Sequence, residues 1–266
     1  EEFMITANVA AAETLEKQRQ PCMYRIHDRP SKEKADALNQ FLRSLDLQFA
    51  KGQVPQPRQF NQILRSVAGE PEAHMVKQMI LRSQAQAEYS PHNISHFGLA
   101  LRRYAHFTSP IRRYADLLVH RALVSGLKLG PGGLDNHGED FEDLAGHISA
   151  TERRAAKAER DAVDRFTALY LTDQIGAEFA ARVNGVSRAG LFVTLKETGA
   201  DGLVPIRTLP NDYYDHDPIL HTLTGTSHGI VFSLGQELKV RLEEAIPLTG
   251  GLIMALVGGE QTAMPS

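Results

Sequence analysis

The sequence predicts an α+β protein in which a mostly helical part, residues 1–173, is followed by a small five-stranded barrel, residues 174–257. Two observations carry this prediction. Apolar residues recur every three or four positions through most of the first part, as on the buried face of a helix. After Gly176 the pattern changes to short runs rich in Val, Leu and Phe, separated by turns that contain glycine, which favours strands.

Composition limits the classes of function. The chain has 266 residues, 42% of them hydrophobic, and a net charge of −3 at pH 7, so any nucleic-acid surface must be local. Cys22 is the only cysteine, which excludes an intrachain disulfide or a multi-cysteine zinc site and fits a reducing cytoplasm. No apolar run reaches the roughly 20 residues of a membrane span. The start lacks a signal-peptide pattern, so we expect no membrane partner.

Periodicity and capping signals predict helices over residues 1–19, 31–47, 58–68, 71–87, 109–126 and 139–171. A short strand is predicted over residues 23–28, ended by Pro30. In the first helix Glu1 and Asn8 share one face, next to the apolar face, so a carboxylate and an amide are expected to point together.

The most informative stretch is residues 96–121, HFGLALRRYAHFTSPIRRYADLLVHR, which contains five arginines. Ser109 is a preferred N-cap and Pro110 a preferred first helical residue, so a helix is expected to begin there. The core face of this helix is predicted to comprise Ile111, Tyr114, Ala115, Leu118 and Ala122.

Arg112 and Arg113 would fall in the first turn of that helix, where free N–H groups and the helix dipole favour a negative partner. Backbone donors beside a planar guanidinium suit a phosphate. Tyr104 and Phe107, just upstream, offer ring faces to bases. The alternative is an ordinary exposed ion pair between Arg112 and Asp116, one turn further on.

The long helix over residues 139–171 is predicted to carry one buried apolar stripe: Phe141, Leu144, Ile148, Ala155, Ala162, Phe166 and Tyr170. Glu159 falls within this stripe, on the inward side. A buried carboxylate needs a partner or a function. A salt bridge to an arginine of the central helix is the structural alternative.

Strands are predicted over residues 179–183, 191–195, 203–205, 230–232 and 237–242, and five short strands suggest an OB barrel. Phe192 points away from its apolar neighbours, so it is a candidate stacking platform for a base; a contact within the protein is the alternative. Lys239 and Arg241 alternate outward on the last strand and are candidates for phosphate contacts or solvated charges.

Two groups of metal-binding side chains are present, and neither is predicted to bind metal. His92 and His96 have a helical spacing, but Pro91 and Asn93 disfavour a helix there. The acidic segment around His216 contains Asp212, Asp215 and Asp217, which suit a hard cation. Because NDYYDHDP is rich in turn-forming residues, we predict a loop between barrel strands instead.

The central stretch resembles the signature of the RNase II/RNase R family, the RNB family of processive 3′-to-5′ exoribonucleases, in its RNase R version. EEFMITAN (1–8), YRIHDRP (24–30) and AERD (158–161) extend the resemblance to nearly the whole chain. GLFVTL followed by GLVP resembles the ribosomal RNA-binding type of OB fold. The resemblance implies the C-terminal part of an RNB catalytic domain at 1–173 and an OB-fold RNA-binding domain at 174–257. The last residues, 258–266, are expected to form a disordered tail, as chain termini often do.

The resemblance further implies hydrolysis of single-stranded RNA to nucleoside 5′-monophosphates by two Mg²⁺ ions, whose aspartate ligands lie upstream of this chain. We therefore expect a piece of a longer enzyme that is inactive by itself. Its catalytic candidates are Arg112, which would clamp the phosphate beside the scissile bond, and Glu159, which would lie near the 3′-terminal nucleotides. The expected RNA contacts are Glu1, Asn8, Tyr104, Ser109, Arg113, Phe192, Lys239 and Arg241.

Two other functions stay open. The same fold could bind RNA without cutting it, which depends on whether an intact aspartate cluster lies upstream. A hydrolase could instead use Ser109 with His106, although Ser109 is better explained as a helix cap and no nucleophile-elbow pattern surrounds it. The oligomeric state is open, and a monomer is our expectation.

Overall fold

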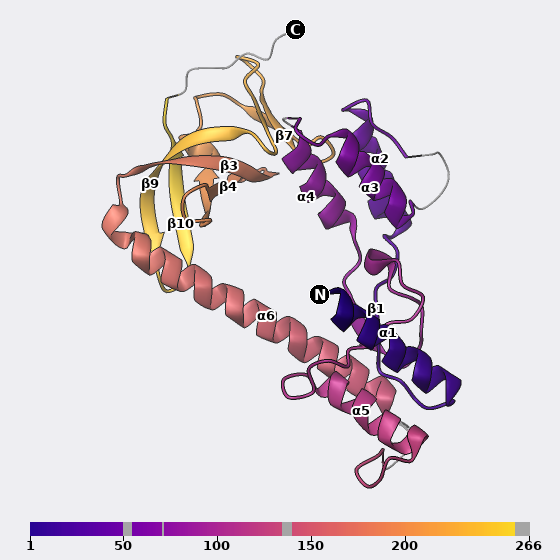
Figure 1. Ribbon diagram of the computed structural model, residues 1–266. Coiled ribbons are helices and arrows are strands. Elements are labelled where there is room, and N and C mark those ends of the chain that lie inside the picture. The colour runs from indigo at the N-terminus through magenta and orange to yellow at the C-terminus, as the bar shows by residue number, and fades with distance from the viewer. Residues whose placement is uncertain (50–54, 71, 135–139, 259–266) are drawn as a thin grey trace. The chain divides into compact units, whose positions relative to one another are not determined.

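The computed structural model describes residues 1–49, 55–70, 72–134 and 140–258 (Figure 1). The chain folds as two compact units. The first comprises Glu1–Asp36, Phe49–Ile63 and Ile80–Ala155, and the second comprises Ala37–Gln48, Leu64–Met79 and Ala156–Ser266. The predicted disordered tail lies, from residue 259 on, outside the described residues. Within the described ranges, no helix is long and apolar enough to cross a membrane.

The predicted helices are present, with ends that differ by a few residues. They are α1 (Glu2–Lys17), α2 (Lys32–Arg43), α3 (Pro57–Ser66), α4 (Ala73–Ser83), α5 (Tyr114–Leu127) and α6 (Phe141–Leu171). The predicted strand at 23–28 is β1 (Tyr24–Ile26), which pairs antiparallel with β2 (Glu88–Ser90). Three single 3₁₀ turns complete the described helical structure: η1 (Phe97–Leu99), η2 (Thr172–Gln174) and η3 (Ile206–Thr208).

The core of the first unit is formed by α1, α5, the β1–β2 pair and the beginning of α6. Leu15 of α1, Val119 of α5 and Phe141 of α6 are at most 2% exposed and belong to one apolar cluster. Beside this cluster, Arg25 of β1 forms a two-pronged ion pair with Glu152 of α6, at 2.7 and 3.1 Å. The segment after η1, which carries the arginine-rich stretch, is joined to β1 by a hydrogen bond from the Arg25 N–H to the Tyr104 carbonyl at 2.9 Å.

The second unit contains a closed barrel with the strand order β10-β5-β4-β3-β9 (Figure 1). Its strands are β3 (Glu178–Ser187), β4 (Gly190–Leu195), β5 (Asp201–Pro205), β9 (Glu237–Ile246) and β10 (Gly251–Leu256). The five-stranded barrel is confirmed, but one of its five strands is not the predicted one. The predicted strand at 230–232 is β8 (Val231–Ser233), which lies outside the barrel, and β10 closes the barrel instead.

The connection from β5 to β9 carries a separate three-stranded sheet, formed by β6 (Tyr214–Asp217), β7 (Thr222–Gly225) and β8. The prediction of a loop over NDYYDHDP is therefore wrong for its second half, which pairs with β7. The prediction that it connects barrel strands is correct, because the whole sheet is inserted between two of them.

The predicted buried stripe of α6 is wrong over the middle of the helix. Phe141, Ala145 and Ser149 are buried at its beginning, and Ala168 and Leu171 are buried at its end against the barrel core. Between these two groups the apolar side chains of Ala155, Ala162, Val163 and Phe166 are exposed, and so is Tyr170, next to Leu171. Apolar periodicity identifies one face of this helix, but the middle of that face is exposed.

Candidate nucleic-acid interface

The central helix begins later than predicted, because a turn precedes it. Arg113 is the N-cap of α5, with extended backbone angles and no capping hydrogen bond from its side chain. The Ser109 carbonyl accepts hydrogen bonds from the Arg112 and Arg113 N–H groups, at 3.4 and 3.2 Å. Ser109 is thus not the N-cap, and Pro110 is not the first helical residue.

A buried carboxylate holds this turn. Asp116 is fully buried and accepts a hydrogen bond from the Ser109 N–H at 2.8 Å. The same carboxylate receives Nε and Nη2 of Arg113, both at 2.8 Å. A buried, two-pronged pair of this kind is geometrically specific. The alternative ion pair between Arg112 and Asp116 is not formed, since the partner of Asp116 is Arg113, three residues away.

Arg112 is presented differently from its neighbour. Its side chain is exposed, and its Nε donates to Ser109 Oγ at 2.9 Å. Within the described ranges, no carboxylate forms an ion pair with Arg112. The Ser109 hydroxyl is neutral, so Arg112 keeps its full charge while one of its nitrogens is held in place. The turn therefore offers one fixed, uncompensated guanidinium to solvent.

The other arginines of the stretch have different partners. Arg103 forms an ion pair with Glu16 of α1, and Arg121 donates to the Gly133 carbonyl at 2.9 and 3.1 Å. Arg102 is exposed, and no ion pair joins it to a carboxylate in the described parts of the chain. Sequence reasoning did not select Arg102, although it stands in the same arginine-rich stretch.

The exposed side chains beside the turn were predicted to be buried. Ile111 is fully exposed, and Tyr114 is half exposed. Of the predicted core face of this helix, Ala115, Leu118 and Ala122 are buried as expected. The shift follows from the later helix start, which places Ile111 in the turn rather than in the first helical turn.

Asn8 ties α1 to the segment before the turn. It is buried, its Nδ2 donates to the Tyr104 hydroxyl at 3.0 Å, and its Oδ1 accepts from the Phe107 N–H at 2.9 Å. Tyr104 is itself only 8% exposed. Both side chains thus position the backbone that leads into the turn, and their predicted RNA contacts stay predictions. Glu1 is exposed and caps α1 through its backbone carbonyl.

Histidines and tyrosines of this segment and its neighbours pack against one another. His106 Nδ1 lies 2.9 Å from the Tyr89 hydroxyl, and the His96 and His106 rings each pack edge-on against Tyr104. Burial, together with the charges of Arg113 and Arg25, lowers the pKa of His106 to about 4. Burial and the neighbouring His27 lower the pKa of His96 to about 4 as well. These rings are therefore neutral at pH 7.

This geometry disfavours the alternative of a serine hydrolase. Ser109 Oγ accepts from Arg112, whereas the hydrogen bond recorded for His106 is to Tyr89. A serine nucleophile needs its base within hydrogen-bond reach. The two candidate groups are engaged elsewhere.

In the second unit, Glu159 lies in the exposed middle of α6, so its predicted inward position is wrong. The alternative, a salt bridge to an arginine of the central helix, is not among the ion pairs of the described residues. An exposed carboxylate can remain charged without a partner. Its predicted catalytic role stays a prediction.

Phe192 lies on the outer face of β4 and is 45% exposed. It pairs with Gly185 of β3, and a side chain at that glycine would come within 3.3 Å of the Phe192 ring. The glycine therefore leaves room for the ring to lie over the strand. This arrangement fits the predicted stacking platform.

Lys239 and Arg241 project from β9 and form exposed ion pairs. Lys239 Nζ lies 2.6 Å from Glu178, and Arg241 Nε lies 2.7 Å from Glu243. Pairs of this kind contribute only about 0–1 kcal/mol to stability. Both cations can therefore exchange partners for a phosphate at small cost.

The metal-ligand candidates are used by the protein itself. Although burial opposes it, hydrogen bonds from the backbone N–H groups of His228 and Ser227 lower the pKa of Asp212. Asp217 accepts from two further backbone N–H groups, and His96 accepts from the Leu99 N–H. Within the described residues, no group of three or more His, Cys, Asp or Glu could hold a metal ion.

Two domain families match the sequence. Residues 1–128 match the RNB domain, and residues 172–256 match the S1 RNA binding domain. Ribonuclease R from Escherichia coli K12 is 42% identical over 252 residues, covering 91% of this chain and 31% of the relative. Ribonuclease R from Aquifex aeolicus is 42% identical over 241 residues, covering 91% and 34%.

A solved structure has the same fold. Mycoplasma genitalium RNase R in complex with ribose-methylated single-stranded RNA superposes with a TM-score of 0.87 at 30% identity, covering 96% of this chain and 40% of that one. The chain thus spans about a third of the length of the curated relatives. Residues 1–128 thus match an RNB domain and residues 172–256 an S1 RNA binding domain, in a chain that is similar to ribonuclease R over most of its own length and shares its fold.

Proposed function

We propose that this chain is the RNA-holding part of a processive 3′-to-5′ exoribonuclease that hydrolyses single-stranded RNA to nucleoside 5′-monophosphates. The observation that carries the proposal is the turn at residues 109–113, in which Asp116 neutralises Arg113 while Arg112 stays charged and exposed. The similarity to ribonuclease R supports the reaction type. The S1 match and the likeness to an RNase R structure with bound RNA support RNA as the ligand.

In this proposal Arg112 binds the phosphate beside the scissile bond. Its guanidinium can meet two phosphate oxygens at once, whereas a lysine would act as a single point charge. A fixed positive group stabilises the charge that develops on phosphate oxygens during hydrolysis, and it does so without reorganising at that moment. The Ser109 hydroxyl and the buried Asp116 supply that fixation, through Arg112 Nε and the Ser109 N–H respectively.

The described residues do not fit the Mg²⁺ that the family resemblance implies. The carboxylate nearest the turn, Asp116, is buried and fully engaged by Arg113 and the Ser109 backbone. We therefore propose that the metal ligands belong to the upstream part of the catalytic domain. The remaining candidates, Glu159 and the barrel surface, would hold the 3′ end and the rest of the strand.

The test is incubation of the 266-residue chain with end-labelled single-stranded RNA, first with Mg²⁺ and then with a chelator, reading retention and stepwise shortening. We expect retention without shortening. A chimera in which this chain replaces the matching 252-residue segment of the E. coli ribonuclease R is then expected to shorten RNA stepwise.

The outcomes separate the candidates. Retention by both proteins, with a folded chimera that never shortens RNA, would favour a non-catalytic RNA-binding protein. Mg²⁺-dependent shortening by the chain alone would contradict the assignment of the metal ligands upstream. A failure of the chain to retain RNA would contradict the proposal as a whole.

A further inference from the structure

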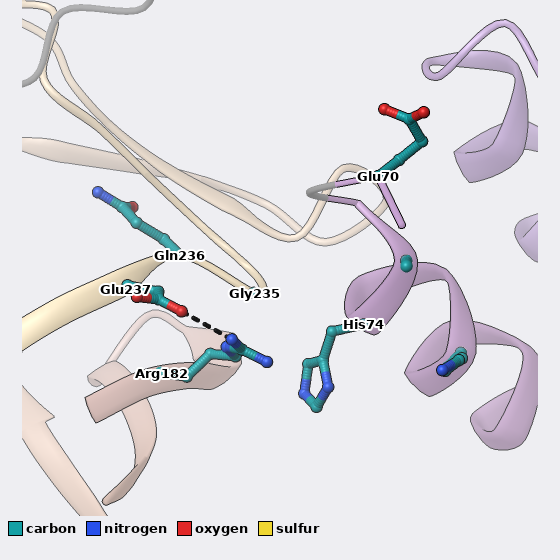
Figure 2. A pocket seen from close by; sticks show the side chains of 8 residues that line it. Glu70, His74, Arg182, Gly235, Gln236 and Glu237 are labelled. Carbon is teal, nitrogen blue, oxygen red and sulfur yellow. Dashed lines mark hydrogen bonds and ion pairs between the residues drawn. The ribbon is translucent and has the colours of Figure 1, made fainter. Parts of the chain in front are cut away.

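A pocket in the second unit is separate from every candidate site described above. Its volume is about 600 Å³, and it lies beside α4 and the barrel strands β3 and β9 (Figure 2). His74 and Lys77 of α4 line it on one side. Arg182 of β3 and Glu237 of β9 line it on the other. In Figure 2 the His74 ring extends from α4 toward Arg182.

Positive charge exceeds negative charge at the Arg182 end of the pocket. Glu237 accepts from Arg182 Nη2 at 2.7 Å and from Lys196 Nζ at 2.6 Å, so one carboxylate serves two cations. The hydrogen bond from Lys196, followed by that from Arg182, lowers the pKa of Glu237 to about 2. On the opposite side, Lys77 of α4 adds a further cation to the lining. The other acidic lining residue, Glu70, extends away from Arg182 and His74 (Figure 2).

Arg182 also has an unused donor. Its Nε is buried, and no hydrogen-bond partner exists for it among the described residues. A buried donor without an acceptor is unfavourable, and native structures rarely leave one. Because Nε is covered, an anionic oxygen in the pocket would reach it only after the Arg182 side chain turns toward the pocket, and it would then supply the missing acceptor.

His74 lies within the field of these cations. Burial lowers the pKa of His74, and the charges of Arg182 and Lys77 lower it further. Gln78, one turn along α4, brings its amide nitrogen within 3.2 Å of His74 Nε2. His74, Lys77 and Arg182 thus line one space, together with a carboxylate, that of Glu237, whose charge is shared between Arg182 and Lys196.

We propose that this pocket binds the phosphate group of a nucleotide, with Arg182 and Lys77 as the charged contacts and His74 as a further donor. The volume exceeds what a lone phosphate fills and lies in the range of about 300–1,000 Å³ of small-molecule sites. The phosphate would come either from the backbone of an RNA strand or from a free mononucleotide. The site depends on none of the residues assigned to the nuclease function.

The test follows the His74 imidazole by NMR in the whole chain, with a His74→Gln variant to identify its signal. Three probes are titrated: inorganic phosphate, adenosine 5′-monophosphate and a short oligoribonucleotide without terminal phosphates. Binding of a phosphate is expected to move the His74 signal and to raise its pKa from below 6.5, because the anion offsets the charges of Arg182 and Lys77. A phosphodiester has a fixed charge, so in the third titration any pH dependence belongs to the protein.

Two variants with opposite expectations sharpen the test. Arg182→Gln is expected to weaken phosphate binding at least tenfold, whereas Glu237→Gln removes the competing carboxylate and is expected to tighten it. Arg188→Gln, an exposed arginine of the same barrel outside the pocket, is expected to change binding less than twofold. Unchanged signals of the other histidines show that each variant is folded.

A response to the oligoribonucleotide identifies the RNA backbone as the source, and a response to the mononucleotide alone identifies a free nucleotide. The proposal is overturned if none of the three probes moves the His74 signal, or if Arg182→Gln responds as the unaltered chain does. Loss of RNA retention by Arg112 variants would leave this result unchanged, so the two proposals fail separately.

Discussion

The turn at residues 109–113 and the outer face of the barrel both carry arginine and lysine, and they hold these charges in different ways. In the turn, Arg113 is locked to a fully buried carboxylate, and this lock fixes the exposed Arg112 next to it. On the barrel, Lys239 and Arg241 pair with exposed carboxylates that cost little to exchange. The difference teaches that the turn can orient a phosphate, whereas the barrel face can only attract one.

The largest effect on the free energy of unfolding is expected from removing the buried carboxylate that binds Arg113. Asp116→Ala leaves the Arg113 charge and the Ser109 N–H without partners, so we expect a loss of about 3–5 kcal/mol in the free energy of unfolding. Urea unfolding followed by circular dichroism measures it. Asp116→Asn keeps an acceptor for the Ser109 N–H and is expected to lose less.

Asp161→Ala is the matched control, because Asp161 forms an exposed ion pair with Lys157 on α6. It is expected to change the free energy of unfolding by no more than about 1 kcal/mol. If Asp116→Ala proved no more harmful than this control, the contrast between a locked and a solvated charge would be lost.

Stacking on the barrel should give the next largest effect. Phe192→Ala is expected to weaken binding of single-stranded RNA by about 1–3 kcal/mol, the usual range for one stacked base. Fluorescence anisotropy with a labelled oligoribonucleotide measures the affinity. Tyr213→Ala removes another exposed aromatic of the same unit and should leave affinity unchanged; equal losses in both variants would argue against a platform at Phe192.

Acid should lower the free energy of unfolding, because two buried histidines beside the turn are neutral in the folded chain. The pKa values of His96 and His106 are about 4 in the folded chain, below the ordinary value of 6.5. The unfolded chain therefore takes up these protons first, and stability is expected to fall as the pH drops from about 6.5 toward 4. Urea midpoints across this range measure the slope. His106→Gln should flatten it and the exposed His92→Gln should not; identical slopes in all three proteins would contradict the assignment.

The smallest effects are expected from the exposed pairs. Lys239→Gln and Arg241→Gln should each change the free energy of unfolding by no more than about 1 kcal/mol. Each should reduce the slope of log affinity against log salt by about 0.7 if the cation meets one phosphate of a single strand. Slopes identical to that of the unaltered chain would remove these two residues from the RNA surface.

Local pattern was enough to predict the helices and the barrel, because periodicity and turn residues act over a few positions. It failed at the start of α5, where Ser109 and Pro110 have the chemistry of a helix start but the Ser109 N–H is taken by Asp116. Which arginine pairs with Asp116 depends on the extended backbone of Arg113, and a sequence does not display that backbone.

Burial was harder to predict than secondary structure. Apolar spacing correctly marked one face of α6, yet Phe166 is 73% exposed, because spacing says nothing about what covers a face. The strand β10 was missed since its outward residues are also apolar, which hides the alternation of an exposed strand. The pocket at His74 and Arg182 joins residues far apart in sequence, so no local pattern could indicate it.

The most direct test of the account is the turnover of the E. coli chimera carrying Arg112→Ala. Removing one fixed charge-stabilising donor lowers turnover by about 10²- to 10³-fold in other enzymes, and we expect a loss of that order with little change in RNA affinity. Arg112→Lys should recover only part of it, because an ammonium lacks the guanidinium fork. If turnover stayed unchanged while RNA affinity fell, Arg112 would be a binding residue only, and the central role of the turn would be contradicted.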